Sequence, residues 1–211
     1  MEPTAPTPPD PARRSVRARR AILDATAQLI AEKGYADVTI EAIAARAGVG
    51  KPTIYRWWPS KAMVTIELLI EIAEQTTGYP DTGDFAADLR TQMQGLIAAI
   101  HPPRTSPLAG VIAEGLQNPD VARQLRELLL EPQLELFRAR LRLAQQQGQF
   151  PPDADPEVAL YLLYGPLHYR LLYDLGMPDA HELDTLITRA LHARNEPAEP
   201  RPAPDSTSAR H

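Results

Sequence analysis

Hydrogen-bond donors are concentrated in one short segment of the chain, residues 51–61, KPTIYRWWPSK. Lys51 can donate to O6 and N7 of guanine. The Thr53 hydroxyl can pair with several bases and its methyl group can contact that of thymine, whereas Pro52 between them offers only an apolar contact. Such groups at the start of a helix can read base edges in the major groove. The segment therefore indicates binding to double-stranded DNA.

The residues just before this segment predict the scaffold that presents it. Ile40, Ile43 and Ala44 recur at the spacing of one helical face. Thr39 before them is suited to cap a helix N-terminus, and Gly48 after them can take the left-handed conformation that ends a helix. The next helix is predicted to begin with the donor segment itself. Two short helices joined by a glycine turn form a helix-turn-helix, whose second helix can enter a major groove.

The distribution of charge supports this interpretation, although the whole chain carries a net charge of −5. Residues 11–61 hold ten basic and four acidic side chains, a net of +6, and the rest hold twelve and twenty-three, a net of −11. Such asymmetry is typical of a DNA-binding head on an acidic body. Five arginines between positions 13 and 20, Arg17 among them, form either a solvated run or an arm that follows phosphates. We favour the arm.

Other classes of function find little support in the sequence. The chain has no cysteine, and its five histidines lack metal-ligand spacing. No phosphate-binding glycine loop or nucleophile motif is present, so we expect no enzyme activity, no cofactor and no metal site. The N-terminus lacks a signal-peptide pattern, and the longest apolar run, residues 158–167, is too short to span a bilayer. A cytoplasmic protein without a membrane partner is expected.

Three pieces of the head resemble the signature of TetR-type transcriptional regulators: Thr39-Ile40, Ala47-Gly48-Val49 and residues 55–61, YRWWPSK. The resemblance covers roughly residues 15–65. Residues 147–172 also resemble a C-terminal domain found in one branch of that family. The resemblance implies a bacterial regulator with an all-α fold, built from a three-helix DNA-binding head and a helical body for dimerisation and effector binding.

The resemblance also suggests which side chains meet DNA. Tyr55 and Trp57 match positions that usually contact phosphates, and Lys61 and Thr39 lie at helix starts that favour a phosphate. Two positions depart from the family pattern. Gly50 replaces a frequent serine, and Trp57 replaces His, Tyr or Arg, a change for which Arg56 can supply the missing charge. The predicted DNA-binding residues are Arg17, Thr39, Gly50, Lys51, Pro52, Thr53, Tyr55, Arg56, Trp57 and Lys61.

The sequence predicts about nine helices and divides the chain into four segments. Residues 1–12 and 195–211 are proline-rich and expected to be disordered tails, residues 13–61 form the head, and residues 62–194 form the body. Within the body, prolines and glycines predict helices near 84–101, 106–116, 118–147, 156–175 and 179–194. Pro132 is expected to kink the longest of them.

Two helices near the C-terminus are candidates for a dimer interface. The helix over 156–175 is apolar on nearly every side, and the next carries the stripe Leu183, Leu186, Ile187 and Ala190. Burial of the first helix inside one subunit is the alternative. We favour the homodimer because DNA-binding specificity benefits from two half-sites.

An effector pocket is a further possibility in the body. Tyr161, Tyr164 and His168 fall at i, i+3 and i+7 beside Gly165-Pro166, where a kink would open space. An ordinary aromatic core with satisfied hydroxyls is the alternative. The family's usual use of these helices adds Met93, Ile97 and Leu125 as walls. The resulting hypothesis is a ligand-responsive repressor, with a regulator that binds a protein partner, or an activator, as alternatives.

Overall fold

A computed structural model describes residues 11–76 and 78–192, which fold into α-helices without a strand among them. The head holds α1 (Pro11–Lys33), α2 (Ile40–Ala47) and α3 (Lys51–Tyr55). The other elements are α4 (Lys61–Thr76), α5 (Phe85–Ile100), η1 (Pro103–Thr105), α6 (Pro107–Gly115), α7 (Pro119–Leu125), η2 (Arg126–Leu130), α8 (Glu131–Gln146), α9 (Pro156–Tyr173) and α10 (Ala180–Leu191). The all-α prediction is confirmed. Residues 11 and 12 belong to α1 rather than to a tail, and residues 193–211 lie outside the described residues.

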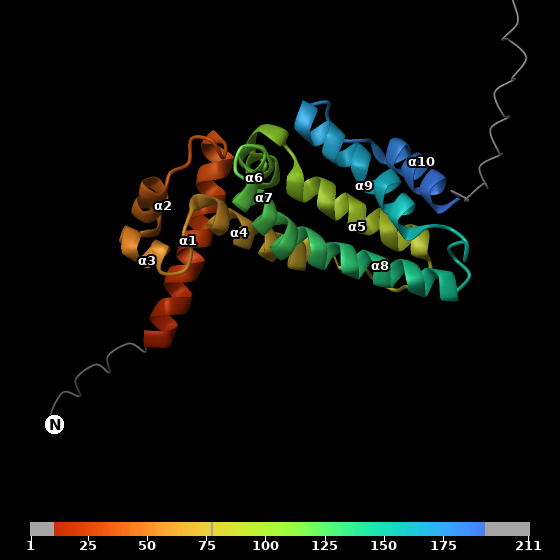
Figure 1. Cartoon of the computed structure of the whole chain (residues 1–211), viewed down its shortest axis with the longest axis horizontal. Helices are drawn as coiled ribbons and strands as arrows, with labels where there is room; N and C mark the ends of the chain where they lie inside the picture. The colour runs from red at the N-terminus through yellow and green to blue at the C-terminus, as the bar shows by residue number, and fades with distance from the viewer. Residues whose placement is uncertain (1–10, 77, 193–211) are drawn as a thin grey trace, which may run out of the picture.

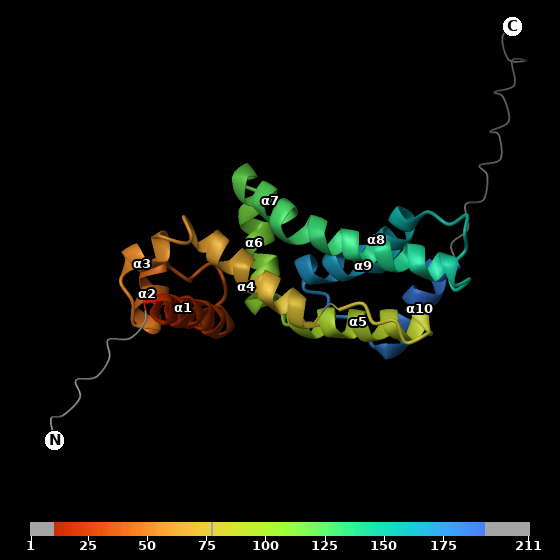
Figure 2. The same cartoon turned by 90° about the horizontal axis from the view of Figure 1, so that it is seen from below.

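The molecule is elongated, with the head at one end and the bundle of α5, α8, α9 and α10 at the opposite end (Figure 1 and Figure 2). Helix α4 leaves the head and ends beside the C-terminal half of α5, with α6 and α7 next to it. No helix of residues 11–76 and 78–192 is long and apolar enough to cross a membrane.

The core of the head forms where the apolar faces of its three helices meet. Ile22 and Ile30 of α1, Ile43 of α2, Ile54 of α3 and Trp58 are all at most 2% exposed. The same apolar cluster continues through α4 into Val111 of α6 and Val121 of α7. Head and body therefore share one packed core along α4, which makes α4 a rigid connection rather than a linker.

A second apolar cluster holds the body together. It is built around Phe85 and Met93 of α5, Phe137 of α8 and Leu163 of α9, with Ile187 of α10. These side chains come from four helices that meet at the end farther from the head (Figure 2).

The predicted helix over residues 118–147 is interrupted near Pro132. Instead of a simple kink, residues 126–130 form a π turn in which the Glu131 amide donates to the carbonyl of Arg126. Pro132 lacks an amide hydrogen and its ring crowds the preceding turn of an α-helix. A wider turn just before the proline relieves that crowding. The interruption divides the predicted helix into α7 and α8.

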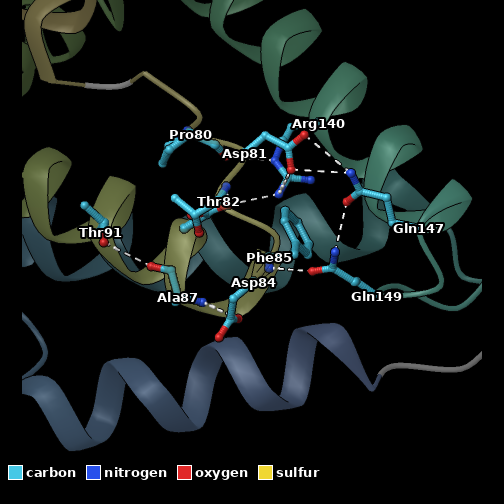
Figure 3. A network of polar contacts seen from close by, with 11 residues as sticks. Pro80, Asp81, Thr82, Asp84, Phe85, Ala87, Thr91, Arg140, Gln147 and Gln149 are labelled. Carbon is cyan, nitrogen blue, oxygen red and sulfur yellow. Dashed lines mark hydrogen bonds and ion pairs between the residues drawn. The ribbon is translucent and has the colours of Figure 1, made fainter.

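A buried ion pair fixes the loop that follows α4 (Figure 3). Arg140 Nη2 lies 3.0 Å from Asp88 Oδ2, and the two side chains are 4% and 5% exposed. Arg140 Nε donates to the carbonyl of Pro80, while Asp88 accepts from the amide and the hydroxyl of Thr82. Burial pushes the pKa of Asp88 upward, but hydrogen bonds from Thr82 and Arg140 outweigh it, so the pKa lies below its ordinary value.

Candidate nucleic-acid interface

The turn between α2 and α3 has the geometry that the sequence predicts. Thr39 caps α2, its hydroxyl oxygen accepting from the Ala42 amide at 3.1 Å. Gly48 ends the helix in the left-handed conformation, with φ 66° and ψ 33°. The Val49 amide then donates to the carbonyl of Ala44. This compact turn sets α3 against α2 and fixes the direction in which α3 points.

Helix α3 presents one polar surface and buries the opposite one. Lys51, Pro52, Tyr55 and Arg56 are exposed, while Ile54 is completely buried in the head core. Gly50 occupies the N-cap position with φ −79° and ψ 148°, and its carbonyl accepts from the Thr53 amide. Glycine has no side chain with which to cap the helix or reach a phosphate. All four exposed residues are among those that the sequence assigns to DNA, whereas Thr53, also assigned to DNA, is half-buried.

The two tryptophans after α3 have different environments. Trp58 is 2% exposed, and its indole N–H donates to Glu67 of α4. Trp57 is half-buried, packs edge-on against Trp58 at 5.3 Å between ring centroids, and has the Arg56 guanidinium 5.0 Å above its ring. Arg56 therefore places a positive charge next to Trp57, which is uncharged where the family pattern can have Arg.

Part of the basic arm is held by α4 instead of being free for phosphates. Arg19 Nε donates to Glu67 at 2.6 Å and its Nη1 to Glu71 at 3.1 Å. Arg20 also pairs with Glu71. Arg17 is exposed and makes no ion pair with another described residue. Sequence reasoning missed the glutamates of α4, which tie α1 and Trp58 to the helix that leads into the body.

Lys61 points into the junction between head and body in this structure. Its ammonium donates to the carbonyl of Tyr35 at 3.0 Å and lies 4.1 Å from the centre of the Tyr35 ring. Burial lowers the pKa of Lys61, although the charges of Glu114 and Asp37 oppose that shift. The predicted phosphate contact therefore requires the side chain to turn outward.

Lys51 has a partner that the sequence did not indicate. Its ammonium lies 3.0 Å from the carboxylate of Glu41, in the first turn of α2. Both side chains are more than half exposed, at 52% and 64%. The hydrogen bond from Lys51 lowers the pKa of Glu41, and the same bond raises that of Lys51, so the pair is ionised at neutral pH.

The six residues predicted for an effector pocket lie in different environments. Met93 and Tyr164 pack together in the body core, and Tyr164 donates to Gln92 at 2.9 Å. Leu125 packs instead against the cluster of the head, and Tyr161 is 67% exposed. Helix α9 buries residues 160, 163, 167 and 171, which leaves position 161 outside. Tyr161 and Leu125 therefore lie apart from Met93 and Tyr164.

His168, the remaining polar member, is half-buried and its Nδ1 lies 2.8 Å from the carbonyl of Tyr164. A hollow of about 420 Å³ lies farther along α5. Of the predicted walls it includes only Ile97, and it is lined by Gln94, Ile97, Ala98, His101, Met177, Pro178, Asp179, Ala180 and Leu183.

The predicted dimer stripe on α10 lies largely inside the single chain. Leu183, Ile187 and Ala190 are at most 2% exposed within a single chain, and only Leu186 is partly exposed. A residue already buried inside one subunit gains no burial from a second. Exposed apolar side chains lie instead along α9: Val158, Tyr161, Leu162, Tyr169, Leu172 and Tyr173.

The fold is that of a helix-turn-helix head joined to a helical body. Family models describe the same two parts: "Bacterial regulatory proteins, tetR family" matches residues 22–68, and "Tetracyclin repressor-like, C-terminal domain" matches residues 79–190. The chain belongs to the TetR family and is a DNA-binding transcriptional regulator.

Relatives and solved structures agree with this assignment. The regulator YdeS of Bacillus subtilis, itself uncharacterised, is 33% identical over 72% of this chain and 77% of its own. The TetR family transcription regulator SCO0332 has a TM-score of 0.69 and 32% identity, over 83% of this chain and 97% of its own. FadR of Bacillus subtilis, solved with stearoyl-CoA, has a TM-score of 0.56 and 21% identity over 82% and 97%. The last comparison concerns the fold alone.

Proposed function

We propose that this TetR-family regulator is a homodimeric, ligand-responsive repressor that binds a palindromic operator. The observation that carries the proposal is the pairing of two exposed surfaces on one chain. The surface of α3 offers donors to DNA, and the stripe on α9 offers apolar area to a second copy. A dimer brings two α3 helices to two half-sites, which a single head cannot reach together.

The stripe on α9 supports the dimer by its shape and its composition. Residues 158, 162, 165, 169 and 172–173 follow helical spacing along one face. Tyr161 and Tyr173 are each 67% exposed, and the rings of Tyr169 and Tyr173 are tilted by 41° with their centroids 4.9 Å apart. Gly165 lies in the middle, where nothing lies within 4 Å of the place a side chain would begin. Exposed apolar faces of this kind mark association surfaces, and a twofold axis brings each stripe against itself.

Within the head, we assign base reading to Lys51 and Thr53 at the start of α3. Thr39, Tyr55 and Trp57, with Arg17 on α1, are assigned to phosphates. Lys61 joins them when its ammonium leaves Tyr35. Base contacts give sequence preference, and phosphate contacts give position and affinity.

A route from the body to the head supports the regulatory part of the proposal. The Tyr35 hydroxyl, in the loop between α1 and α2, donates to Glu114 of α6 at 2.6 Å. Gly110 of α6 packs so closely that an added Cβ would lie 2.2 Å from the Tyr35 side chain. A shift of α6 must therefore move the head or break these contacts. Half-sites one helical turn apart require recognition helices about 34–36 Å apart, so such movement changes operator affinity.

The effector itself is proposed only as a small molecule held by the body. FadR of Bacillus subtilis, which shares the fold, binds stearoyl-CoA. Any ligand that favours another head spacing must lower the affinity for DNA, and DNA must lower the affinity for that ligand by the same factor. Reciprocal titration of a ligand found by thermal-shift screening is expected to give equal factors, on the order of 5- to 150-fold. A broad library without effect would favour a protein partner, and tighter operator binding would favour an activator.

Selection from random duplexes tests the central part of the proposal. We expect the full chain to enrich a dyad-symmetric sequence. A plot of log K for that sequence against the logarithm of the salt concentration should have a slope of about −0.9 for each neutralised phosphate. Electrophoretic shifts at several salt concentrations provide the measurement. Enrichment of no dyad, together with a flat salt response, would contradict the proposed function.

A further inference from the structure

Glu41 places a negative charge at the edge of a positively charged head, next to a residue proposed to read bases. Its carboxylate lies 3.0 Å from the Lys51 ammonium and is 64% exposed. Glu41 also lies two residues after Thr39, at the end of α2 proposed to meet a phosphate. A carboxylate so close to the DNA surface lowers affinity for any duplex unless its charge is matched.

We infer that Glu41 is a specificity-determining residue that acts through Lys51 by penalising complexes with non-specific DNA. The inference rests on the proposed function, since it needs Lys51 to read a base. It adds a residue that contacts no base itself.

The chemistry of the ammonium group explains the effect. Lys51 has three N–H donors, so it can donate to guanine while it keeps its bond to Glu41. On the operator, therefore, the carboxylate stays paired. On a non-specific duplex, the strongest available acceptors are backbone phosphates. These phosphates line the edges of the groove, away from the base edges, so Lys51 must leave Glu41 to reach one of them. Glu41 is then unpaired beside the polyanion, and this repulsion weakens the wrong complex more than the right one.

The head contains a matched pair in a different place. Glu32 of α1 and Arg46 of α2 form an ion pair of 2.8 Å, and both side chains are exposed. Arg46 belongs to the last turn of α2, whereas Glu41 belongs to the first. Loss of either carboxylate changes the net charge of the head equally. A comparison of the two therefore separates a general charge effect from one that depends on Lys51.

The experiment compares Glu41→Gln and Glu32→Gln with the wild-type chain. Affinities are measured at fixed salt for the selected operator and for a shuffled duplex of equal length and composition. For Glu41→Gln we expect affinity for the shuffled duplex to rise about three- to tenfold and operator affinity to change less than about twofold. For Glu32→Gln we expect both affinities to change by the same small factor. In a Lys51→Ala background, Glu41→Gln should raise both affinities equally.

Each outcome decides the role of Glu41. Circular dichroism confirms that the exposed substitutions leave the fold intact. An unchanged ratio of operator to shuffled affinity in Glu41→Gln, or a similar drop of that ratio in Glu32→Gln, would overturn the inference. A switch of the preferred base would overturn it too, because Glu41 would then read DNA directly. A wild-type chain that selects no operator would instead contradict the proposed function, and this inference with it.

Discussion

The double variant Leu162→Glu, Tyr169→Glu is expected to be a folded monomer that binds the operator at least about a hundredfold more weakly than the wild-type chain. Leu162 and Tyr169 are 41% and 58% exposed on α9, so glutamate at either position meets water in the single chain. In the proposed dimer the same charges lie unpaired in an apolar interface, which costs several kcal/mol. A factor of a hundred corresponds to about 2.8 kcal/mol.

Sedimentation velocity at micromolar concentration gives the oligomeric state, and circular dichroism gives the fold. Ile187→Asp is the contrasting variant. Ile187 is 2% exposed and packs in the body core, so this substitution is expected to unfold the chain rather than separate two copies. A double variant that remains a dimer would show that the α9 stripe is not the interface.

The second large effect is expected at the buried ion pair. Asp88→Ala leaves the Arg140 guanidinium, 4% exposed, without its buried partner. Breaking such a pair by removal of one side costs about 3–5 kcal/mol. Asp81→Ala is the matched control, because Asp81 also lies near Arg140, at 3.4 Å, but is 45% exposed. We expect the control to cost less than about 1 kcal/mol in urea unfolding at one fixed protein concentration.

The same pair predicts how stability depends on pH. Because the folded-state pKa of Asp88 lies below its ordinary value, the carboxylate stabilises the fold above about pH 3.9, the value in an unfolded chain. That contribution is lost as pH falls through the lower, folded-state pKa. The difference in unfolding free energy between the wild-type chain and Asp88→Asn should therefore be largest near neutral pH and shrink in acid. A difference that grows in acid would contradict this account of the pair.

The sequence predicted the parts of the interface that local chemistry determines. Thr39 as a cap and Gly48 as a left-handed turn depend on neighbours a few residues away, and the structure has both. Contacts between residues that lie far apart in the sequence leave no such signal in the local pattern. The bond from Trp58 to Glu67 and the position of Lys61 over Tyr35 depend on how α4 crosses α1, which periodicity does not give.

The body was harder to predict for a related reason. An apolar stripe such as Leu183 to Ala190 has the same pattern whether it packs on its own chain or on another. Helix α9 is apolar nearly all round, so its sequence does not say which side faces the core. In the structure Leu163 and Leu167 face inward, and Leu162 and Tyr169 face out. The same uncertainty placed Tyr161 in a pocket, although it lies on the surface.

A half-site insertion series tests most directly whether the regulator reads a palindrome as a dimer. On the selected operator, we expect the chain to bind with two heads on one face of the duplex. Insertion of five base pairs between the half-sites turns one of them to the opposite face, and should reduce affinity to that of a non-specific duplex, about 10³-fold or more. Equal affinity for the native and the inserted operator would contradict binding by a rigid dimer.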